Sequence, residues 1–444
     1  MKNEIVPSRY CVIAMATALA LIAAAVVLDA LIDPFGMYRG LVIEGVNASK
    51  PSVYRRVRLY KAFEVRRVQP QAIILGTSRS HLGMRCSHEV WARLPGPCYN
   101  LAFDGATTRE MFAYLRHAHA VRPLRHVVLG LDLYHASFAP SFTRPDFDPH
   151  ILLDARTPWW WRYLTGDLRL LASLDTLRAS IETLRSQGWN ELNWFAPDGQ
   201  RLGEIFFRRP EESFMRNGPR AYFDEIDRLE VTFQTAAAAP RSRDAMAAPA
   251  ARAPAAAESS IAYIRRIVEF CRAEGIDLRI FVTPSHVHQI EIAAATGGWN
   301  SIENGKRELV RVLAEDSTRH SDKPPIPLID FSGYSSITTE ALPPIGSRKE
   351  MRYYWDSSHF KEQVGDYVLE RLFAAGTSSH AVPADFGVRL TEESIDIALL
   401  QQRAARVAYW ERFPQEVAAL QSMVRAQSTP KPVAHAISAS VSAP

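Results

Sequence analysis

Cysteine is scarce in this chain of 444 residues, which contains only four. Four are too few for a disulfide scaffold, and one of them lies in an apolar run near the N-terminus. Cys86 and Cys98 can pair across a short loop in an oxidising compartment, whereas Cys271 has the pattern of a buried helix position. There is no C-x-x-C pair, and His286 and His288 lack a third ligand nearby. We therefore expect no metal site and no cofactor.

An excess of one charge is also lacking, because 52 basic side chains nearly balance 48 acidic ones. No basic stripe alternates with aromatic residues, so we expect no nucleic-acid partner. One basic cluster follows the apolar N-terminal run, and we interpret it as the solvated face of a helix or as a contact to lipid headgroups. Its members are Arg55, Arg56, Arg58, Lys61, Arg66 and Arg67.

Charge is absent altogether from residues 11–28, a run of roughly 18 residues that is long enough to cross a bilayer. Lys2 and Arg9 precede this run. Two carboxylates, Asp29 and Asp33, follow it, so positive charge should hold the N-terminus in the cytoplasm and direct the rest outward. A cleaved signal peptide is the alternative. We favour an uncleaved transmembrane anchor, because the run is longer than the usual apolar region of a signal peptide and no clear cleavage site follows it.

Beyond this run, short apolar segments alternate with segments of helical periodicity. Thr107 and Glu110 have the spacing of a capping box at the start of one such helix. Because parallel neighbours need crossover connections, the alternation predicts an α/β fold with a doubly wound parallel sheet of about five strands. Strands are expected at 72–75, 97–102, 126–133, 277–282 and 326–331, and helices at 53–68, 107–121, 261–273, 300–320 and 361–373.

Changes of composition divide the chain. Residues 136–235 lose the alternation and carry aromatic clusters, which indicates a mainly helical insertion. Residues 236–260 are rich in alanine and proline without a buriable face, and we interpret them as a mobile surface loop. The predicted parts are an anchor (1–33), two halves of an α/β domain (34–135 and 261–375), the insertion, the loop, a C-terminal helical segment (376–426) and a disordered tail (427–444).

The stretch 71–84, QAIILGTSRSHLGM, indicates a nucleophile. Its apolar run predicts a buried strand, and the following turn places Ser78 at the carboxyl edge of the sheet, where ligands bind in open parallel sheets. A serine at the start of the next helix also has backbone N–H groups beside it. The alternative is that Thr77 or Ser78 only caps that helix.

A second segment, YYWDSSHF at 353–360, precedes an expected helix. Asp356 and His359 are three residues apart, so the carboxylate can orient the imidazole while the other ring nitrogen reaches outward. The alternative is that Asp356 or Ser358 caps the helix and His359 is a surface residue.

Four short motifs, in this order and at these elements, resemble the blocks of the SGNH (GDSL-like) hydrolase superfamily. They are G-x-S ending at Ser78, N-x-x-x-x-G ending at Gly105, G-x-D ending at Asp132 and D-x-x-H ending at His359. The resemblance covers roughly residues 71–133 and 276–373, and it implies a flavodoxin-like sheet.

The resemblance also implies roles for single residues. Ser78 matches the nucleophile, and Gly105 matches the glycine whose N–H joins that of Ser78 in the oxyanion hole. His359 matches the general base and Asp356 its carboxylate partner.

Two positions depart from the family pattern. The first block reads GTS where the family often has GDS, which keeps the nucleophile and its glycine. Asp132 stands where the family usually has an asparagine that donates to the oxyanion, and an ionised carboxylate cannot donate. Either Asp132 is turned away or protonated, or the register differs, or the site does something other than ordinary ester hydrolysis.

A single membrane helix before such a domain is similar to bacterial cell-envelope proteins of alginate O-acetylation and D-alanyl transfer. The resemblance implies a single-pass protein of the inner membrane with a periplasmic esterase or O-acyltransferase domain, an acylated carbohydrate or acyl donor as substrate and a possible partner membrane protein. The alternative is a catalytically silent binding or export-accessory protein, which Asp132 favours. Two aromatic groups could stack on sugar rings, although aromatic residues more often pack a core: Tyr353, Tyr354 and Trp355, and Trp159, Trp160 and Trp161.

Overall fold

The computed structural model describes residues 7–38, 40, 42–133, 141, 143–153, 166–187, 194–209, 212–238, 258–374 and 381–428. Two predictions fall outside these residues. They are the disordered tail beyond residue 428 and sugar stacking by Trp159, Trp160 and Trp161. Most of the predicted loop 236–260 also lies outside them.

The centre of the fold is a six-stranded sheet with the order β2-β1-β3-β4-β5-β6. All neighbouring strands are parallel except β5 and β6, which are antiparallel. The predicted α/β fold with a parallel sheet is therefore confirmed, and β6 adds an edge strand that was not expected. The strands are β1 (Ala72–Leu75), β2 (Cys98–Asn100), β3 (His126–Leu131), β4 (Asp277–Val282), β5 (Leu328–Asp330) and β6 (Val388–Arg389).

Both faces of the sheet are buried, which explains why the strands are continuous apolar runs. Successive side chains of a strand point to opposite faces. In β1, Ile73 and Leu75 belong to one apolar core, while Ala72 and Ile74 belong to another. The first core is covered by α3 (Val57–Val68), α6 (Thr108–Val121), α12 (Ser260–Ala273) and α14 (Trp299–Arg319), and the second by α5 (Glu89–Ala92) and α15 (Glu362–Phe373).

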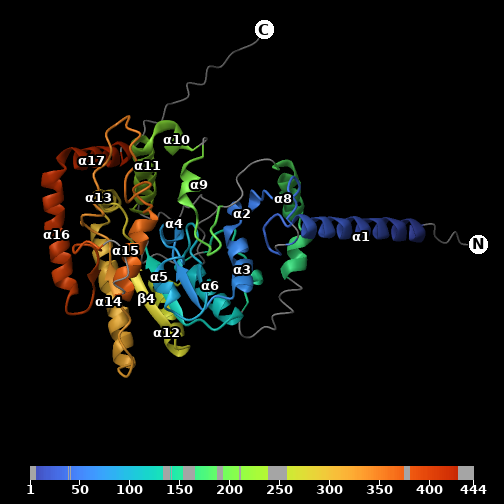
Figure 1. Cartoon of the computed structure of the whole chain (residues 1–444), viewed down its shortest axis with the longest axis horizontal. Helices are drawn as coiled ribbons and strands as arrows, with labels where there is room; N and C mark the ends of the chain where they lie inside the picture. Colours follow the sequence, from blue (N-terminus) through green and yellow to red (C-terminus); the bar gives the residue numbers. More distant parts are fainter. Residues whose placement is uncertain are drawn as a thin grey trace, which may run out of the picture.

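The remaining helices pack around this frame or extend it. The part predicted as a helical insertion contains a 3₁₀ turn and several helices, and the C-terminal segment forms two helices that lie at the end of the molecule opposite α1 (Figure 1). These elements are α2 (Ser52–Arg55), α4 (Ser78–Gly83), η2 (Pro149–Ile151), α8 (Leu174–Arg185), α9 (Gly203–Phe207), α10 (Ser213–Asn217), α11 (Pro219–Ala238), α13 (Val287–Ala295), α16 (Ile395–Arg412) and α17 (Pro414–Ser428).

The first helix, α1 (Pro7–Ile32), projects away from the globular part (Figure 1). Its 24 residues from Arg9 to Ile32 are long and apolar enough to cross a membrane. Large side chains along it, such as Val12, Leu19 and Val27, are exposed. Apolar surface of this kind would be unfavourable in water, so α1 fits a membrane anchor.

Local sequence signals are met where partners are close in the chain. Thr107 and Glu110 form the predicted capping box at the start of α6.

The interpretation of the basic cluster as a solvated face is wrong for two members, because Arg58 and Lys61 are buried. Arg58 pairs with the buried Glu110, and the side-chain nitrogen of Lys61 donates to backbone carbonyls, including that of Asn100 at 2.7 Å. Burial lowers the pKa of Lys61 well below its usual value. A buried polar group is stable only when such partners replace water.

A buried histidine connects α13 to the elements that pack on it. His288 Nδ1 lies 2.7 Å from a carboxylate oxygen of Asp227 in α11, and Nε2 lies 3.5 Å from Glu416 in α17. Burial alone lowers the pKa of His288, but the two carboxylates outweigh it and raise the pKa to about 9. The imidazolium therefore holds α11, α13 and α17 together at neutral pH.

We expect this ion cluster to make stability fall at alkaline pH. Because the folded pKa of His288 lies above its unfolded value, its contribution is complete below about pH 6.5 and is lost as the pH rises through about 9. The loss should be on the order of 3 kcal/mol. Thermal melting of the wild type and of His288→Gln between pH 6 and 10 measures it. The wild type should melt at a higher temperature than His288→Gln at pH 6, and this difference should shrink as the pH rises. A difference in melting temperature that stays constant would contradict the assignment.

Candidate active site

The turn that carries Ser78 is held close to the sheet by two glycines. A Cβ atom at Gly76 would lie 2.3 Å from the Oγ of Ser80, and one at Gly130 in β3 would lie 2.4 Å from the same atom. Any side chain at these positions would push α4 off the sheet. The G-x-S sequence thus follows from packing as well as from chemistry, since the glycine lets the short helix begin immediately after β1.

A second close contact joins α4 to α15. A Cβ atom at Gly365 would lie 1.8 Å from the carbonyl oxygen of Gly83, and one at Gly83 would lie 2.0 Å from the ring of Phe360. Backbone therefore packs directly on backbone where the two helices meet. This contact places the start of α4, with Ser78, next to the segment that precedes α15, with His359.

Three residues predicted from the sequence form one chain of hydrogen bonds. The Nε2 atom of His359 lies 2.9 Å from the Oγ of Ser78, although the two residues are 281 positions apart. The Nδ1 atom of His359 lies 2.9 Å and 3.0 Å from the carboxylate oxygens of Asp356. With its Nδ1 proton donated to the carboxylate, the ring has Nε2 available to accept the serine proton.

The carboxylate in this chain is fixed and shielded. Asp356 is fully buried, and it also accepts hydrogen bonds from the backbone N–H groups of Ser358 at 2.7 Å and His359 at 2.9 Å. The imidazole is 21 % exposed, so solvent reaches the ring but not its partner. Asp356 therefore stabilises a turn and at the same time orients the histidine. The alternative that Asp356 or Ser358 caps the following helix is wrong, because α15 begins at Glu362 with Lys361 at its N-cap position and no side-chain cap.

The position that departs from the family pattern, Asp132, is engaged by the residues around Ser78. One of its carboxylate oxygens accepts from the hydroxyl of Thr77 at 2.6 Å and from the guanidinium of Arg79 at 2.8 Å. The other oxygen accepts from the hydroxyl of Thr283 at 2.6 Å. Three donors, one of them the buried cation Arg79, stabilise this carboxylate. Asp132 thus braces the turn through the residues on either side of Ser78.

Arg79 extends this bracing to the base segment. Its guanidinium donates to the hydroxyl of Ser358 at 2.6 Å, and that hydroxyl in turn donates to Glu230 of α11 at 3.1 Å. Burial raises the pKa of Glu230, against the opposing effect of Arg79. One cation therefore connects the nucleophile turn, the segment that carries His359 and the helical insertion.

Gly105, the predicted oxyanion-hole glycine, has φ +60° in the turn after β2. The left-handed backbone conformation favours glycine at this position. A Cβ atom there would lie 2.9 Å from the guanidinium of Arg144, which is the end of a flexible side chain and can move aside. The preceding residue, Asp104, bonds to Arg201 at 2.8 Å and lies 3.2 Å from Nδ1 of His81. Burial would raise the pKa of Asp104, but Arg201 and the two histidines His81 and His359 outweigh it, so the pKa is lowered.

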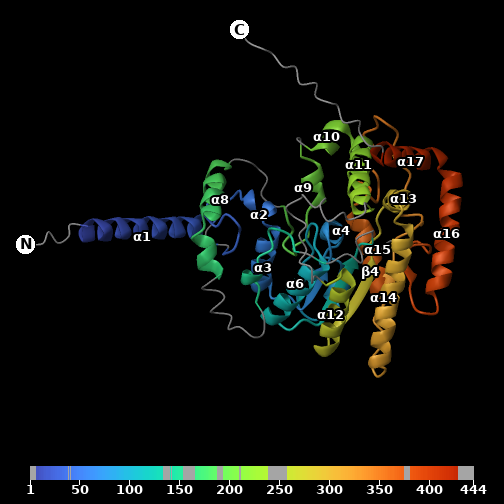
Figure 2. The same cartoon turned by 180° about the vertical axis from the view of Figure 1, so that it is seen from behind.

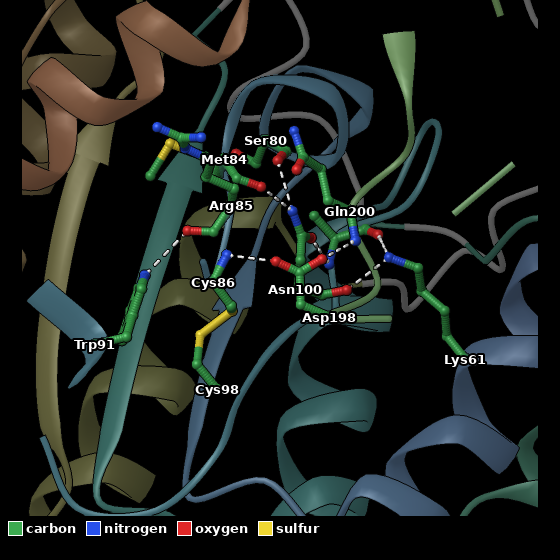
Figure 3. The surroundings of a disulfide bond; sticks show 11 residues. Lys61, Ser80, Met84, Arg85, Cys86, Trp91, Cys98, Asn100, Asp198 and Gln200 are labelled. Atoms are coloured by element: carbon green, nitrogen blue, oxygen red, sulfur yellow. Dashed lines mark hydrogen bonds between the residues drawn. A yellow bond between two sulfur atoms is a disulfide. The ribbon is translucent and has the colours of Figure 1, made fainter. Parts of the chain in front are cut away.

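Asn100, from the second block, holds α4 from beneath (Figure 3). Its side-chain amide donates to the carbonyl oxygens of Ser80 at 2.9 Å and Met84 at 2.7 Å. Cys86 and Cys98, which could pair in an oxidising compartment according to the sequence, form a disulfide beside it that links the loop after α4 to the start of β2. The short helix that begins at Ser78 is thus tied to the neighbouring strand β2 by two hydrogen bonds and by the disulfide that follows it.

Aromatic side chains of the insertion pack next to the base segment. Trp355 stacks on Phe207 of α9 with 4.8 Å between ring centres, and the ring of Phe207 lies 6.5 Å from that of His359. Trp355 and Tyr354 are buried, and the Tyr354 hydroxyl donates to the carbonyl of Pro284 at 2.8 Å. The suggestion that these two residues stack on sugar rings is therefore wrong, because they pack a core instead. Tyr353, beside them, is partly buried.

Comparisons with known proteins give no information about this site, so its chemistry is inferred from its geometry. A scan against protein-family models finds no match, and a search of curated proteins finds no relative.

Some residues of the site were not foreseen. Arg79 and Glu230 were missed, because nothing in their local sequence shows that they meet Ser358. In the described residues no group of three or more His, Cys, Asp or Glu side chains could hold a metal ion.

Proposed function

We propose that this chain is a membrane-anchored, serine-dependent acyl-ester enzyme, an esterase or O-acyltransferase of the cell envelope. The observation that carries the proposal is the chain of hydrogen bonds from Ser78 through His359 to Asp356. Three residues from two distant segments meet there in the order and at the distances that nucleophilic catalysis needs. The alternative roles of helix caps and a surface histidine do not require this meeting.

In the proposed mechanism, His359 takes the proton of the Ser78 hydroxyl as the oxygen attacks the acyl carbon. Asp356 holds the ring and stabilises the imidazolium that forms. The backbone N–H groups of Ser78 and Gly105 then receive the developing oxyanion. His359 then gives the proton to the departing alcohol, and the acyl group remains bound to Ser78 as an ester. Water or a sugar hydroxyl next attacks this ester, and the two cases distinguish an esterase from an O-acyltransferase.

Three features support the SGNH-like assignment and the cell-envelope setting. The order β2-β1-β3-β4-β5 is that of flavodoxin-like sheets. The disulfide between Cys86 and Cys98 suits an oxidising compartment, such as the bacterial periplasm. The helix α1 and the positive charge before it suit a single-pass inner-membrane protein with its catalytic part outside the cytoplasm.

The contacts of Asp132 weaken the case for a catalytically silent protein. That case rested on a carboxylate that would repel an oxyanion. Its two oxygens instead accept from Thr77, Arg79 and Thr283. Arg79 neutralises the negative charge of Asp132, and the hydrogen bonds hold the carboxylate toward the turn that carries Ser78.

A serine-reactive fluorophosphonate probe tests the proposal. We expect the full-length protein in detergent to be labelled, and Ser78→Ala to lose the label entirely, because the nucleophile is removed. Ser80→Ala is the matched control, since this buried serine lies on the same short helix and its hydroxyl has no hydrogen-bond partner among the described residues. Equal labelling of Ser78→Ala and the wild type would reject the assignment.

A further inference from the structure

Helix α8 exposes an apolar stripe at the point where α1 meets the globular part. Leu174, Ile181 and Leu184 are 71 %, 38 % and 40 % exposed, and Leu177 is partly buried between them. These leucines and the isoleucine follow each other at spacings of three and four residues, so they share one face of the helix. An exposed face of this kind on a water-soluble helix is unfavourable unless something covers it.

The opposite face of α8 is bound to the globular part. Asp175 pairs with Arg56 at 3.4 Å, and Glu182 accepts from the hydroxyl of Ser52 at 3.3 Å. Asp175 and Glu182 are seven residues apart and share a face. Leu177 and Leu184 each follow one of them by two residues, which is roughly 200° around a helix. The apolar stripe therefore points away from the protein body.

The direction in which it points is set by α1. Both views show α8 lying crosswise to α1, at the end where α1 enters the globular part (Figures 1 and 2). The two helices are in contact. A helix that crosses a bilayer runs close to the membrane normal, so a helix crosswise to it at its end lies near the plane of the membrane surface.

Other apolar side chains surround the same end of α1. Leu31 in its last turn is 67 % exposed, and its carbonyl oxygen accepts from the side chain of Asn47 at 3.1 Å. This bond fastens the loop that carries Val42 and Ile43, which are 61 % and 44 % exposed. The lipid-facing surface of α1 thus continues into apolar groups on either side of its base.

We propose that α8 lies in the lipid–water interface, with Leu177, Ile181 and Leu184 inserted among the acyl chains next to α1. The occupant of the exposed face is the phospholipid bilayer, because the face continues the apolar surface of α1 and points away from the protein body. Arg178 beside the stripe is 78 % exposed at its side chain and is placed to meet lipid phosphates. This inference rests on α1 crossing the membrane, as the proposed function assumes.

An interfacial α8 would set the height and the tilt of the domain. A single span lets the domain tilt about the base of α1. A second contact, in the plane of the surface, restricts this tilt and holds the α8 side of the domain against the membrane.

Fluorescence quenching in liposomes tests the inference on the full-length protein. An environment-sensitive label is placed at Ile181→Cys or Leu184→Cys in a Cys11→Ala background; Cys271 is buried and the other two cysteines are bonded to each other. The liposomes contain zwitterionic and anionic phospholipids, with a nitroxide on the acyl chain as the lipid quencher and iodide as the aqueous quencher.

Two controls separate the anchor from α8. Leu400→Cys in α16 places the label on an exposed leucine at the far end of the molecule, and its 61 % exposure falls within the range of 38–71 % that Leu174, Ile181 and Leu184 span. The wild type labelled at its own Cys11, which is exposed in α1, reports whether the span is inserted.

We expect nitroxide lipids to quench the labels at Ile181→Cys and Leu184→Cys several-fold more strongly than the label at Leu400→Cys, and iodide to show the reverse order. Iodide quenching at Ile181→Cys equal to that at Leu400→Cys, with Cys11 quenched by lipid, would overturn the inference and leave the anchor standing. Protection from both quenchers would also overturn it, because a protein would then cover the stripe. Absence of lipid quenching at Cys11 would refute the anchor and, with it, the inference.

Discussion

Ser78→Ala and His359→Ala are each expected to lower the turnover of a nitrophenyl acetate surrogate by at least ~10³-fold. The reason is that the 2.9 Å contact between Ser78 Oγ and His359 Nε2 makes the hydroxyl and the ring one unit. Without the serine there is no nucleophile, and without the ring nothing takes the proton of the serine. The double variant should therefore be no worse than either single variant, because each change already removes the whole unit.

Steady-state kinetics of the three variants and of Ser80→Ala measure this prediction. Ser80→Ala should keep its turnover within a few-fold of the wild type, since its hydroxyl is buried away from the base. Thermal midpoints of all four proteins show whether a loss of turnover reflects unfolding. Turnover of His359→Ala close to that of the wild type, or multiplied losses in the double variant, would mean that the two residues do not act together.

Asp132→Asn is expected to lower both stability and turnover, although asparagine is the residue that the resembling family has at this position. Asparagine offers one oxygen and one N–H₂ group where the carboxylate now has two accepting oxygens. The hydroxyl of Thr77 and the guanidinium of Arg79 donate to one carboxylate oxygen, and the hydroxyl of Thr283 donates to the other. The hydroxyl of Thr283 can turn and accept from the new N–H₂ group. The main loss is therefore that of the charge of Asp132, which leaves the buried Arg79 with Glu230 at 3.9 Å as a remaining carboxylate partner. We expect a loss of about 2–4 kcal/mol in the free energy of unfolding.

Turnover should fall by about 10²-fold, because Thr77 and Arg79 flank Ser78 and small displacements of a reacting group are costly. Thr283→Val is the matched control. It removes one neutral donor and keeps the pair of Arg79 and Asp132, so it should cost only about 1 kcal/mol and little turnover. Chemical denaturation and the nitrophenyl acetate assay measure both variants. Faster turnover of Asp132→Asn at unchanged stability would show that the carboxylate suppresses the reaction, as it would if it faced the oxyanion.

The parts of the fold that the sequence predicts are those with local signals. The runs at 72–75 and 277–282 match β1 and β4, since strands buried on both faces are continuous apolar segments. Strand β6 carried no such signal, because it has only two residues and both are exposed. The strands expected at 97–102 and 326–331 were too long, because β2 and β5 each contain only three residues.

The candidate site divides in the same way. Ser78, Asp356 and His359 stand in short motifs whose chemistry can be recognised locally, and the structure brings them together. The partners of Arg79 come from segments far along the chain, and no pattern around them announces the contact. The burial of Lys61 was not predicted for the same reason, because its backbone carbonyl partners are brought to it by tertiary packing.

The separation of 281 positions between Ser78 and His359 also separates the two in time, while the chain is being made. Ribosomes add ~5–20 residues per second, so the serine leaves the ribosome roughly 15 to 60 seconds before the histidine. The contact between Gly83 and Gly365 cannot form earlier either. Under the proposed function, a growing chain thus carries a serine hydroxyl without its base until residue 359 has been made, and a chain that terminates before this residue keeps α1 but never acquires His359.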